Sequence, residues 1–388
     1  VMSKVATHLD RRWPARVVSI NWGPWEKRGM VSEELLRQFE RRGITLIPSP
    51  VGRRRLVDEI RYGRKGESEV IVAGRSGDTR DLVDRDTPSW PLLEVATPRV
   101  KSGLVEVAYT LDPARDLLLD DHRLDGSSVL PAAEAIELMA EVAKHGWPRL
   151  EVVRLSDIRV QRGIVLGEGP REVRIVARAD TARPVEDGNL AVEVRLTDIS
   201  ASRRPYYRAT VELAERLPPA PRYEAAYATP LKSFPETVEQ AYSKYLFHGP
   251  MLQCIDEIEG INEEGIVGRV TPSSPERSLT WEPQGEWLID PVVIDSGFQL
   301  AIVWARMVHD FTPLPSSFEV YHRYGSLSQS PIWCYLHSQA DPNSLTMRTQ
   351  LFFVASDGHI VGAFEGAEST CSRALNRMTG LGRLGGGT

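Results

Sequence analysis

The chain has 388 residues, of which 41% are hydrophobic and 26% are charged, and its formal net charge is −6. This length allows two or three domains with a sizeable core. The acidic balance argues against nucleic acid as the main partner, because phosphate binding requires a basic surface. The longest uncharged apolar run, near 298–305, is too short to cross a bilayer. The first dozen residues carry charges and no signal-peptide core, so we expect a cytoplasmic protein without membrane contact.

Residues 1–74 alternate strand and helix signals. The runs ARVVSINW (15–22) and SEVIVAG (68–74) are rich in β-branched residues, and MVSEELLRQFERRG (30–43) has the pattern of an amphipathic helix. The arginine-rich segment 52–56 favours one solvated helix face over a nucleic-acid site. Together these signals predict the end of an α/β sheet.

Residues 75–98 are polar and contain several prolines, which predicts a linker. Beyond it, residues 99–220 and 221–375 each combine one strong helix signal with alternating strand-like runs, and a proline-rich stretch at 215–230 separates them. The runs are VEVAYTL, EVRIVARA, LAVEVRLTDI and YRATVELAE in the first half, and IVGRVTP, WCYLHSQA, MRTQLFFVAS and HIVGAFEGAE in the second. This pattern predicts an α+β fold with one helix and one antiparallel sheet in each half.

The first strong helix is expected from Pro131 to Gly146, with the proline at its opening turn and the glycine at its end. Its charged residues follow at three- and four-residue steps and form one polar stripe: Glu134, Glu137, Glu141 and Lys144. Between Pro131 and Lys144 every other position is Ala, Ile, Leu, Met or Val. A helix that is apolar over most of its circumference must be covered on most sides, as a curved sheet would do.

The second strong helix is expected at about 291–308 and is more apolar still. Its interior polar pair, Asp295 and Gln299, lies four residues apart and therefore on one face. A buried carboxylate costs several kcal/mol unless it is hydrogen-bonded or neutralised. From the residues alone, Asp295 is either a functional acid or a residue that caps the backbone amides at the helix start.

His122 has a glycine four positions on, Gly126, and a proline nine positions on, Pro131. Average glycine and proline frequencies would give that spacing after some histidine in roughly 3 of 100 such chains. A lone histidine is more often structural than catalytic, so the residues alone leave both interpretations open.

The His122 motif, followed by the Asp295 motif, resembles the paired motifs of dehydratase domains in polyketide and fatty-acid synthases. Between them YLFHGPML (245–252) resembles the aromatic-Gly-Pro motif of that family, and LPSSF (314–318) resembles its later Leu-Pro motif. The four motifs stand in the family's order over about 100–375. The resemblance implies a double hot dog fold, in which two antiparallel sheets are each wrapped round a central helix.

The opening segment VMSKVATHLDRRWPARVVSINWGPWEKRGM resembles the carboxyl end of the ketoreductase that precedes such a dehydratase. The resemblance is best to iterative synthases of the polyunsaturated-fatty-acid or enediyne type. It implies that residues 1–74 are the C-terminal remnant of a Rossmann-like ketoreductase. Because the family's catalytic tyrosine and nucleotide-binding turn should lie upstream, we expect this part to reduce nothing.

The resemblance implies that the domain removes water from a 3-hydroxyacyl thioester on an acyl carrier protein and forms a trans-2-enoyl thioester. It makes His122 the base and Asp295 the acid. A neutral imidazole is available near pH 7, whereas an aspartic acid with its ordinary pKa of about 3.9 keeps its proton only if burial raises that pKa. A resting ion pair of protonated His122 and ionised Asp295 is the alternative.

Supporting roles also follow from the resemblance. The backbone amide of Gly126 is the candidate donor to the thioester oxygen, and Gln299 is expected to orient the Asp295 carboxyl. Pro131 is expected to set the helix start and to take no part in the chemistry.

In segment 245–252, His248 stands where modular relatives commonly have a tyrosine, so this position offers an imidazole in place of a hydroxyl. Tyr245 could supply a hydroxyl if its backbone direction permits, or it could simply pack. Gly249 and Pro250 complete the motif.

No cofactor is expected on this chain, because the substrate is carried on the phosphopantetheine of the carrier protein. The expected partners are that carrier protein, the other domains of the same megasynthase and a second copy in a homodimer. Arginines such as Arg323 could face an acidic carrier or lie in a solvated loop.

Cysteine and glycine patterns suggest neither a metal nor a nicotinamide. Cys254, Cys334 and Cys371 lie far apart without metal-site spacing, which predicts reduced thiols that pack in the core. The segment GLGRLG (380–385) matches a dinucleotide-binding glycine pattern, but only three residues follow it and no helix can begin there. Residues 376–388 are therefore predicted to be a flexible tail.

Three other functions fit the same residues. A cyclase or double-bond isomerase of the same fold could keep both proton carriers. A non-catalytic dimer scaffold within the megasynthase is a second alternative, which the presence of both carriers argues against. A hot dog thioesterase is the third, and it would need an activated water or a carboxylate nucleophile.

Overall fold

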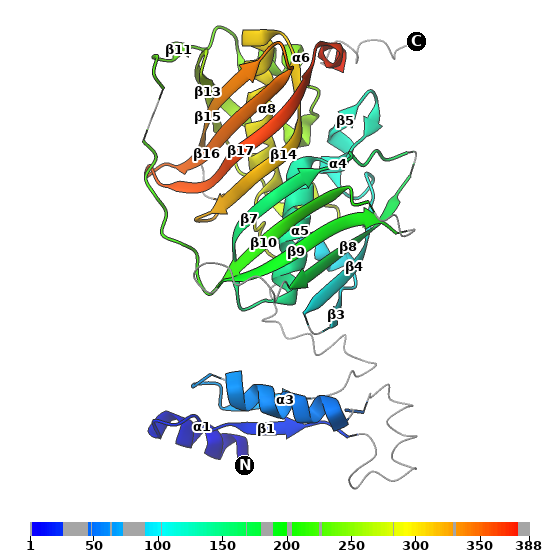
Figure 1. Cartoon of the computed structure of the whole chain (residues 1–388), viewed down its shortest axis with the longest axis vertical. Coiled ribbons are helices and arrows are strands. Elements are labelled where there is room, and N and C mark those ends of the chain that lie inside the picture. Colours follow the sequence, from blue (N-terminus) through cyan, green and yellow to red (C-terminus); the bar gives the residue numbers. More distant parts are fainter. Residues whose placement is uncertain are drawn as a thin grey trace. The chain divides into compact units, whose positions relative to one another are not determined.

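The structure is a computed structural model of the whole chain. It describes residues 2–25, 46–47, 49–62, 64–72, 90–101, 103–167, 169–179, 189–199, 204–224, 227–281, 283–328 and 331–378. They form two compact units, Val1–Thr87 and Pro88–Thr388 (Figure 1). The helix predicted at 30–43 and the glycine pattern at 380–385 lie outside the described residues.

The first unit has an α/β arrangement. Its described elements are α1 (Met2–Arg12), β1 (Ser19–Trp22), α3 (Ser49–Tyr62) and β2 (Glu69–Val72). The strands β1 and β2 pair in parallel, with Ser19 opposite Glu69. Parallel neighbours need a crossover connection between them, and α3 lies in that connection, with Arg53 and Arg55 exposed. Both β-rich runs of the sequence are therefore strands, as predicted.

The second unit contains two halves of similar architecture. The first half comprises η2 (Leu93–Val95), β3 (Arg99–Lys101), β4 (Leu104–Leu111), α4 (Leu117–Asp121), β5 (Arg123–Leu124), β6 (Ser127–Ser128), α5 (Ala132–Gly146), β7 (Glu151–Val160), β8 (Arg171–Ala179), β9 (Leu190–Asp198) and β10 (Tyr207–Ala214). The second half comprises β11 (Lys232–Ser233), α6 (Val238–Tyr245), η4 (Pro250–Leu252), β12 (Ile255–Asn262), β13 (Gly265–Val270), α7 (Pro275–Ser278), α8 (Pro291–His309), β14 (Thr312–Arg323), β15 (Ile332–Asp341), β16 (Thr346–Ala355), β17 (Ile360–Ser372) and η5 (Arg373–Met378). Each half has one long helix, α5 or α8, at the two predicted places.

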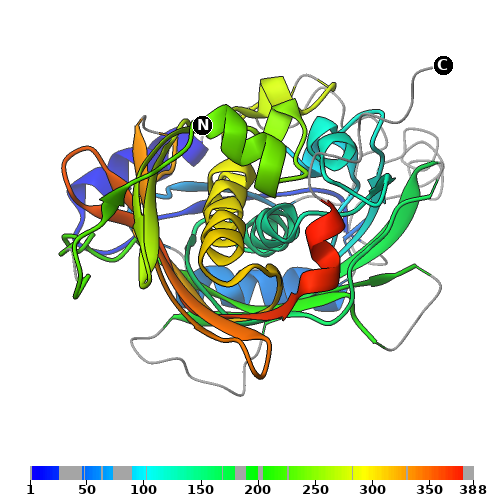
Figure 2. The same ribbon diagram turned by 90° about the horizontal axis from the view of Figure 1, so that it is seen from above.

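The two sheets expected from the sequence are joined into one continuous sheet. Its strand order is β11-β12-β13-β15-β16-β17-β14-β7-β10-β9-β8-β4-β3. The antiparallel pair β7–β14 makes the junction, with Phe318 opposite Ile158 and Tyr321 opposite Leu155. The sheet curves round α5 and α8, which pack against each other (Figure 2). This joining places the two helices, one from each half, side by side.

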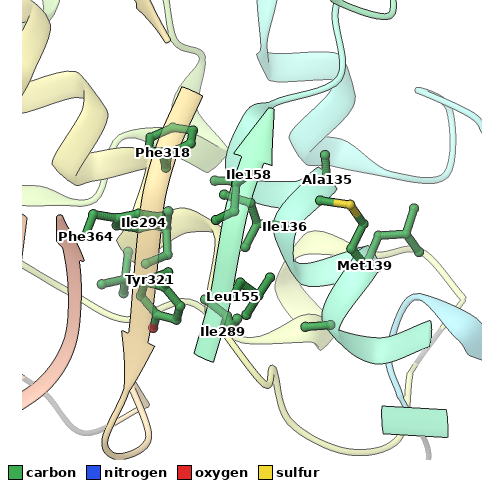
Figure 3. Close-up of a cluster of buried hydrophobic side chains, with 14 of the residues drawn as sticks. Ala135, Ile136, Met139, Leu155, Ile158, Ile289, Ile294, Phe318, Tyr321 and Phe364 are labelled. Atoms are coloured by element: carbon green, nitrogen blue, oxygen red, sulfur yellow. The ribbon is translucent and has the colours of Figure 1, made fainter. Parts of the chain in front are cut away.

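The junction of the two halves is apolar. Figure 3 shows Ile136 and Ile294, from the two long helices, beside Leu155, Ile158 and further buried side chains of the strands. Within α5, every residue from Ala133 to Lys144 is buried. By length and composition α8 could cross a membrane, but 78% of that stretch is buried inside the protein, as expected for a core helix.

The charged stripe of α5 is buried rather than solvated. Glu141 accepts the backbone N–H groups of Leu92 and Leu93 at 3.1 Å, and Glu137 accepts those of Leu288 and Ile289 at 2.8 and 2.7 Å. Carboxylates that accept backbone N–H groups in the interior satisfy donors that would otherwise be unpaired. The stripe therefore fixes the segments that precede β3 and α8 onto the central helix.

Three predictions about the chain's course need correction. The linker predicted at 75–98 is too long, because Leu92 is fully buried and is bound by α5. The tail predicted at 376–388 begins too early, because η5 continues to Met378 and Asn376 donates to Asp310 O at 3.0 Å. Arg323 neither faces a carrier nor lies in a solvated loop, since it is 9% exposed and its Nε donates to Leu288 O.

Candidate active site

His122 lies at the open end of a short hairpin. It is the C-cap residue of α4, and it is followed by β5 and β6, which pair as Arg123–Ser128 and Leu124–Ser127. The hairpin extends to Val129, whose N–H donates to His122 O at 2.9 Å. His122 Nδ1 lies 2.7 Å from Val129 O. Because a carbonyl oxygen can only accept, Nδ1 carries the proton and Nε2 of the neutral ring has a free lone pair.

Gly126 lies in the tight turn of this hairpin. Asp125 and Gly126 both have positive φ, 49° and 81°, and they form the two-residue loop between β5 and β6. An Asp-Gly pair with two positive φ angles is typical of a type I′ turn, which suits the twist of a hairpin. Gly126 is exposed. A glycine is therefore needed at position 126 because it forms the turn that closes the His122 hairpin.

Asp295 lies in the second turn of α8 and is 3% exposed. It does not cap the helix: that role belongs to Asp290, whose side chain accepts the N–H groups of Val292 and Val293. The capping interpretation of Asp295 is thus wrong. Burial raises the pKa of Asp295, while the charge of His122 and the amide of Gln299 act in the opposite direction.

Gln299 is held by hydrogen bonds on both ends of its amide. Its Nε2 donates to Asp295 Oδ2 at 2.7 Å and to Leu252 O at 2.9 Å, and its Oε1 accepts from the Tyr242 hydroxyl at 3.1 Å. The same hydroxyl accepts the Ile255 N–H at 3.1 Å. This chain of contacts fixes the orientation of the amide and directs an N–H at one carboxylate oxygen of Asp295.

His248 lies beside both residues. Its Nε2 is 3.3 Å from Asp295 Oδ2, and its ring centroid is 5.5 Å from that of His122. It stacks on Phe247 with a centroid distance of 4.0 Å and is 4% exposed. Burial, and then the neighbouring charge of His122, lower the pKa of His248 well below its usual value. His248 is therefore neutral near pH 7.

The Gly-Pro turn fastens His248 to the segment that carries His122. Gly249 N donates to Asp121 O at 2.8 Å, and Met251 N donates to Asp121 Oδ2 at 2.6 Å. A Cβ at Gly249 would overlap the Asp121 carboxylate. Pro250 opens the short helix η4 that follows. The turn thus binds the residue directly before His122, which explains why the two histidines meet.

Gly249→Ala is expected to disturb the site more than the bulk of the fold. The added methyl group must displace Asp121 or the turn, at a cost of about 1–3 kcal/mol, and His122 should move with Asp121. Urea unfolding and the rate of the expected elimination of water test this. We expect the variant to be less stable than the parent. We also expect its rate to fall by more than the unfolded fraction of the protein accounts for. An unchanged rate would contradict this.

Not every predicted site residue reaches this place. The structure brings together one ligand-type atom each of His122, His248 and Asp295, all within 4.8 Å of one another. Tyr245, at the end of α6, donates instead to Glu236 Oε1 at 3.0 Å. Pro131 is the N-cap residue of α5, as expected for a residue that sets a helix start.

Tyr242, which no sequence motif indicated, supplies the hydroxyl that contacts Gln299. The overlooked signal was the capping box Thr237-x-x-Gln240, which begins α6 shortly before this tyrosine. A cavity of about 440 Å³ lies along this helix and is lined by Tyr242, Phe247 and His248 among others. A hydroxyl at the site therefore comes from α6 and not from the Gly-Pro motif.

Tyr242→Phe is expected to lower both stability and rate, because it leaves the Ile255 N–H and Gln299 Oε1 without their shared hydroxyl. Loss of a buried partner costs about 1–3 kcal/mol, and Gln299 would no longer be held in one orientation. Tyr245→Phe is the matched control, since its hydroxyl donates to Glu236 near the surface. Equal effects of the two variants on the rate would refute the positioning role.

Two family descriptions match the second unit. Residues 90–196 match the polyketide synthase dehydratase domain, and residues 223–379 match the polyketide synthase dehydratase N-terminal domain. Together they cover more than half of the chain. The chain belongs to the polyketide synthase dehydratase family. Its second unit is thus a dehydratase domain of the polyketide synthase type, which is a hydro-lyase.

Individual relatives agree with this assignment. The chain is 28% identical over 315 residues to a polyunsaturated fatty acid synthase polypeptide of Thraustochytrium sp.; the match covers 79% of this chain but only 10% of that protein. Among solved structures, the dehydratase domain from the CurF module of curacin polyketide synthase superposes with a TM-score of 0.57 at 16% identity, covering 73% of this chain and 100% of that one. The CurJ dehydratase, solved as an inactive mutant with histidine replaced by phenylalanine, gives 0.52 at 18% identity, covering 73% and 97%. The predicted double hot dog fold is thereby confirmed.

Proposed function

We propose that this dehydratase removes water from a 3-hydroxyacyl thioester on an acyl carrier protein and forms a trans-2-enoyl thioester, with His122 as base and Asp295 as acid. The observation that supports these roles most directly is the meeting of His122, from the first half, with Asp295, from the second, within 4.8 Å. Elimination of water needs one group that accepts a proton and one that donates a proton.

His122 has the protonation state that a base requires. Burial lowers the pKa of its imidazole, although the charge of Asp295 and the Val129 carbonyl oppose this effect. The ring is therefore neutral near pH 7. With Nδ1–H bound to Val129 O, the lone pair on Nε2 is the one that can take the proton alpha to the thioester.

Asp295 has the environment that an acid requires. Burial raises the pKa of its carboxyl, which favours the protonated form before the reaction. Gln299 and His248 both approach Oδ2, so Oδ1 is the oxygen left to carry the acidic proton. After that proton passes to the departing hydroxyl, the Gln299 N–H stabilises the carboxylate that remains.

The short spacing of the two groups also bears on how water leaves. Acid and base within 4.8 Å can both reach one H–C–C–OH unit only if they lie on the same side of it. The proton and the hydroxyl therefore leave from one face of the acyl chain. We assign the amide of Gly126 to the thioester oxygen by resemblance to the family alone, since this residue lies in the exposed turn of the hairpin.

The chain needs no further cofactor for this chemistry, because the phosphopantetheine of the carrier protein would present the thioester. The partners we propose are that carrier protein, the other domains of the megasynthase and a second copy of this chain. The working compartment we propose is the cytoplasm.

Mass spectrometry of a carrier-bound 3-hydroxyacyl chain tests the function. Loss of one water with formation of the 2-enoyl thioester is expected. A shifted double bond would instead favour an isomerase, a ring would favour a cyclase, and a free acid would favour a thioesterase. No change of mass with a folded protein would favour the scaffold interpretation.

A further inference from the structure

The three side chains at the centre of the site are also a set of metal ligands. His122, His248 and Asp295 each offer one ligand atom, and these atoms lie within 4.8 Å of one another. No other group of three histidine, cysteine or acidic residues in the described part of the chain comes together in this way. Two imidazoles and a carboxylate form the ligand set of open zinc sites, and the two nitrogens favour first-row transition metals over Mg²⁺ or Ca²⁺.

One edge of a coordination tetrahedron already exists. His248 Nε2 and Asp295 Oδ2 are 3.3 Å apart. Zinc with bonds of about 2.0–2.1 Å to tetrahedral ligands separates those ligand atoms by about 3.3 Å. One ring nitrogen of His122 lies within 4.8 Å of a ligand atom of His248 and of one of Asp295, so an approach of at most about 1.5 Å completes the set.

The contacts behind the three side chains also suit a metal site. His122 directs its Nδ1–H at Val129 O, at 2.7 Å, which leaves Nε2 for a metal. Asp295 is oriented by the Gln299 amide. Such hydrogen bonds from outside the ligand set hold ligands in place at metal centres. Among the residues that the structure describes, His248 Nδ1 has no hydrogen-bond partner although it is buried, so stacking on Phe247 is what holds this ring.

We propose that His122, His248 and Asp295 bind one divalent first-row transition-metal ion, Zn²⁺ being the best fit, and that this ion inhibits dehydration. The bound metal would occupy the lone pair of His122 and the carboxylate of Asp295, which the elimination of water needs in free form. The inhibition rests on the proposed function, whereas binding of the metal does not. Zn²⁺ would thus be an inhibitor that competes with the substrate for the same two groups.

Binding can be measured without any substrate. Tag-free protein, freed of metal with EDTA and then of EDTA, is titrated with Zn²⁺ by calorimetry and with Co²⁺ by absorption spectroscopy. One ion per site, a tetrahedral Co²⁺ spectrum and no heat with Mg²⁺ are expected. His248→Phe and Asp295→Asn should each weaken binding at least about tenfold, and His248→Gln provides a second variant if the phenylalanine variant fails to fold.

His359→Phe is the matched control. His359 Nδ1 lies 3.2 Å from Asp357 Oδ2, so it repeats the histidine–carboxylate pair at a half-exposed site that is not part of the three-residue group. Its loss should leave Zn²⁺ binding unchanged. Absence of binding to the parent protein, or equal binding by parent, His248→Phe and Asp295→Asn, would overturn the metal site.

The inhibition is tested separately. Zn²⁺ added at concentrations that saturate the calorimetric site should stop loss of water, and EDTA should restore it. Full activity with the site saturated would refute inhibition. Metal binding by a protein that dehydrates no substrate would refute the proposed function and leave the metal site standing.

Discussion

His122→Ala is expected to slow dehydration strongly with little change in folding. Removal of a positioned general base typically costs about 10²–10⁴-fold in rate, and the alanine also loses the bond to Val129 O. Mass spectrometry of the enoyl product gives the rate, and circular dichroism and urea unfolding report the fold. His359→Ala, which alters a half-exposed histidine, is the control and should keep the parent rate.

Asp295→Asn is expected to lose a similar factor for a different reason. The amide is nearly isosteric and can still contact Gln299, but it has no acidic proton to give to the departing hydroxyl. The double variant should be little slower than the slower single variant, because groups that act in one step are not additive. A fully active Asp295→Asn variant would exclude this residue as the acid.

The two roles can be distinguished by isotope exchange in deuterated water. If His122 is the base, the Asp295→Asn variant can still exchange the proton alpha to the thioester, whereas His122→Ala cannot. Exchange that persists in His122→Ala and disappears in Asp295→Asn would assign the roles the other way round.

The sequence was sufficient to predict the parts of the fold that follow regular periodicity. The helices α5 and α8 were found because apolar residues cover most of their circumference. Strands such as β8 and β16 alternate between buried and more exposed positions over much of their length, so their period of two was visible. The turn after β16 contains Ser356-Asp357-Gly358, a sequence typical of a hairpin turn, and Gly358 has φ +84° there.

The two strands that join the halves were missed because each breaks that periodicity. In β7, Asp157 has a φ of +48°, and the pairing with β10 is shifted there, so the apolar residues do not alternate. In β14, Pro313 and Pro315 precede the regular part, and its pairing with β17 is shifted after Pro315. The single continuous sheet therefore could not be predicted from local pattern.

The site was predictable only where it follows a motif. The sequence separates His122 from Asp295 by more than half of the second unit, and only the β7–β14 junction and the contact of α5 with α8 bring them together. The approach of His248 to both depends on the Gly249–Asp121 contact, which no local signal encodes. The capping box at Thr237 marks the start of the helix that carries Tyr242, but the role of Tyr242 became visible only through its bonds to Gln299 and Ile255.

Glu134→Gln is expected to stabilise the protein at alkaline pH. Glu134 is fully buried on α5. In the described part of the chain its two carboxylate oxygens, and Oδ2 of Asp116, have no N–H or hydroxyl partner. Burial, and then the charge of Asp116, raise the pKa of Glu134 well above its ordinary value. Burial raises the pKa of Asp116 to about 6. Two carboxyl groups in this arrangement are satisfied when Glu134 keeps a proton and donates it to Asp116.

The sign of the pH effect follows from this proton. The charge of Asp295 also raises the pKa of Glu134, and the charge of Glu134 raises the pKa of Tyr109 and of Tyr207. None of these three groups is a cation. In the unfolded chain Glu134 ionises near pH 4.3, whereas the folded protein retains the proton to much higher pH. Folding therefore takes up a proton, and stability falls by about 1.4 kcal/mol per pH unit above the unfolded pKa until Glu134 ionises in the folded state. The parent protein should thus lose this stability as pH rises.

Glutamine removes the titration but keeps an N–H that can donate to Asp116. The variant should be as stable as the parent at pH 4–5 and increasingly more stable above that range, with a gain in Tm of about 2–4 °C for each kcal/mol.

Glu137→Gln is the matched comparison one turn along α5. The Glu137 carboxylate accepts the N–H groups of Leu288 and Ile289. A glutamine there would place its own NH₂ group against one of these N–H donors, which should destabilise the protein at every pH. Thermal unfolding of the three proteins from pH 5 to pH 9 checks this; a Glu134→Gln variant that loses stability at pH 9 relative to the parent would show that Glu134 is ionised in the fold.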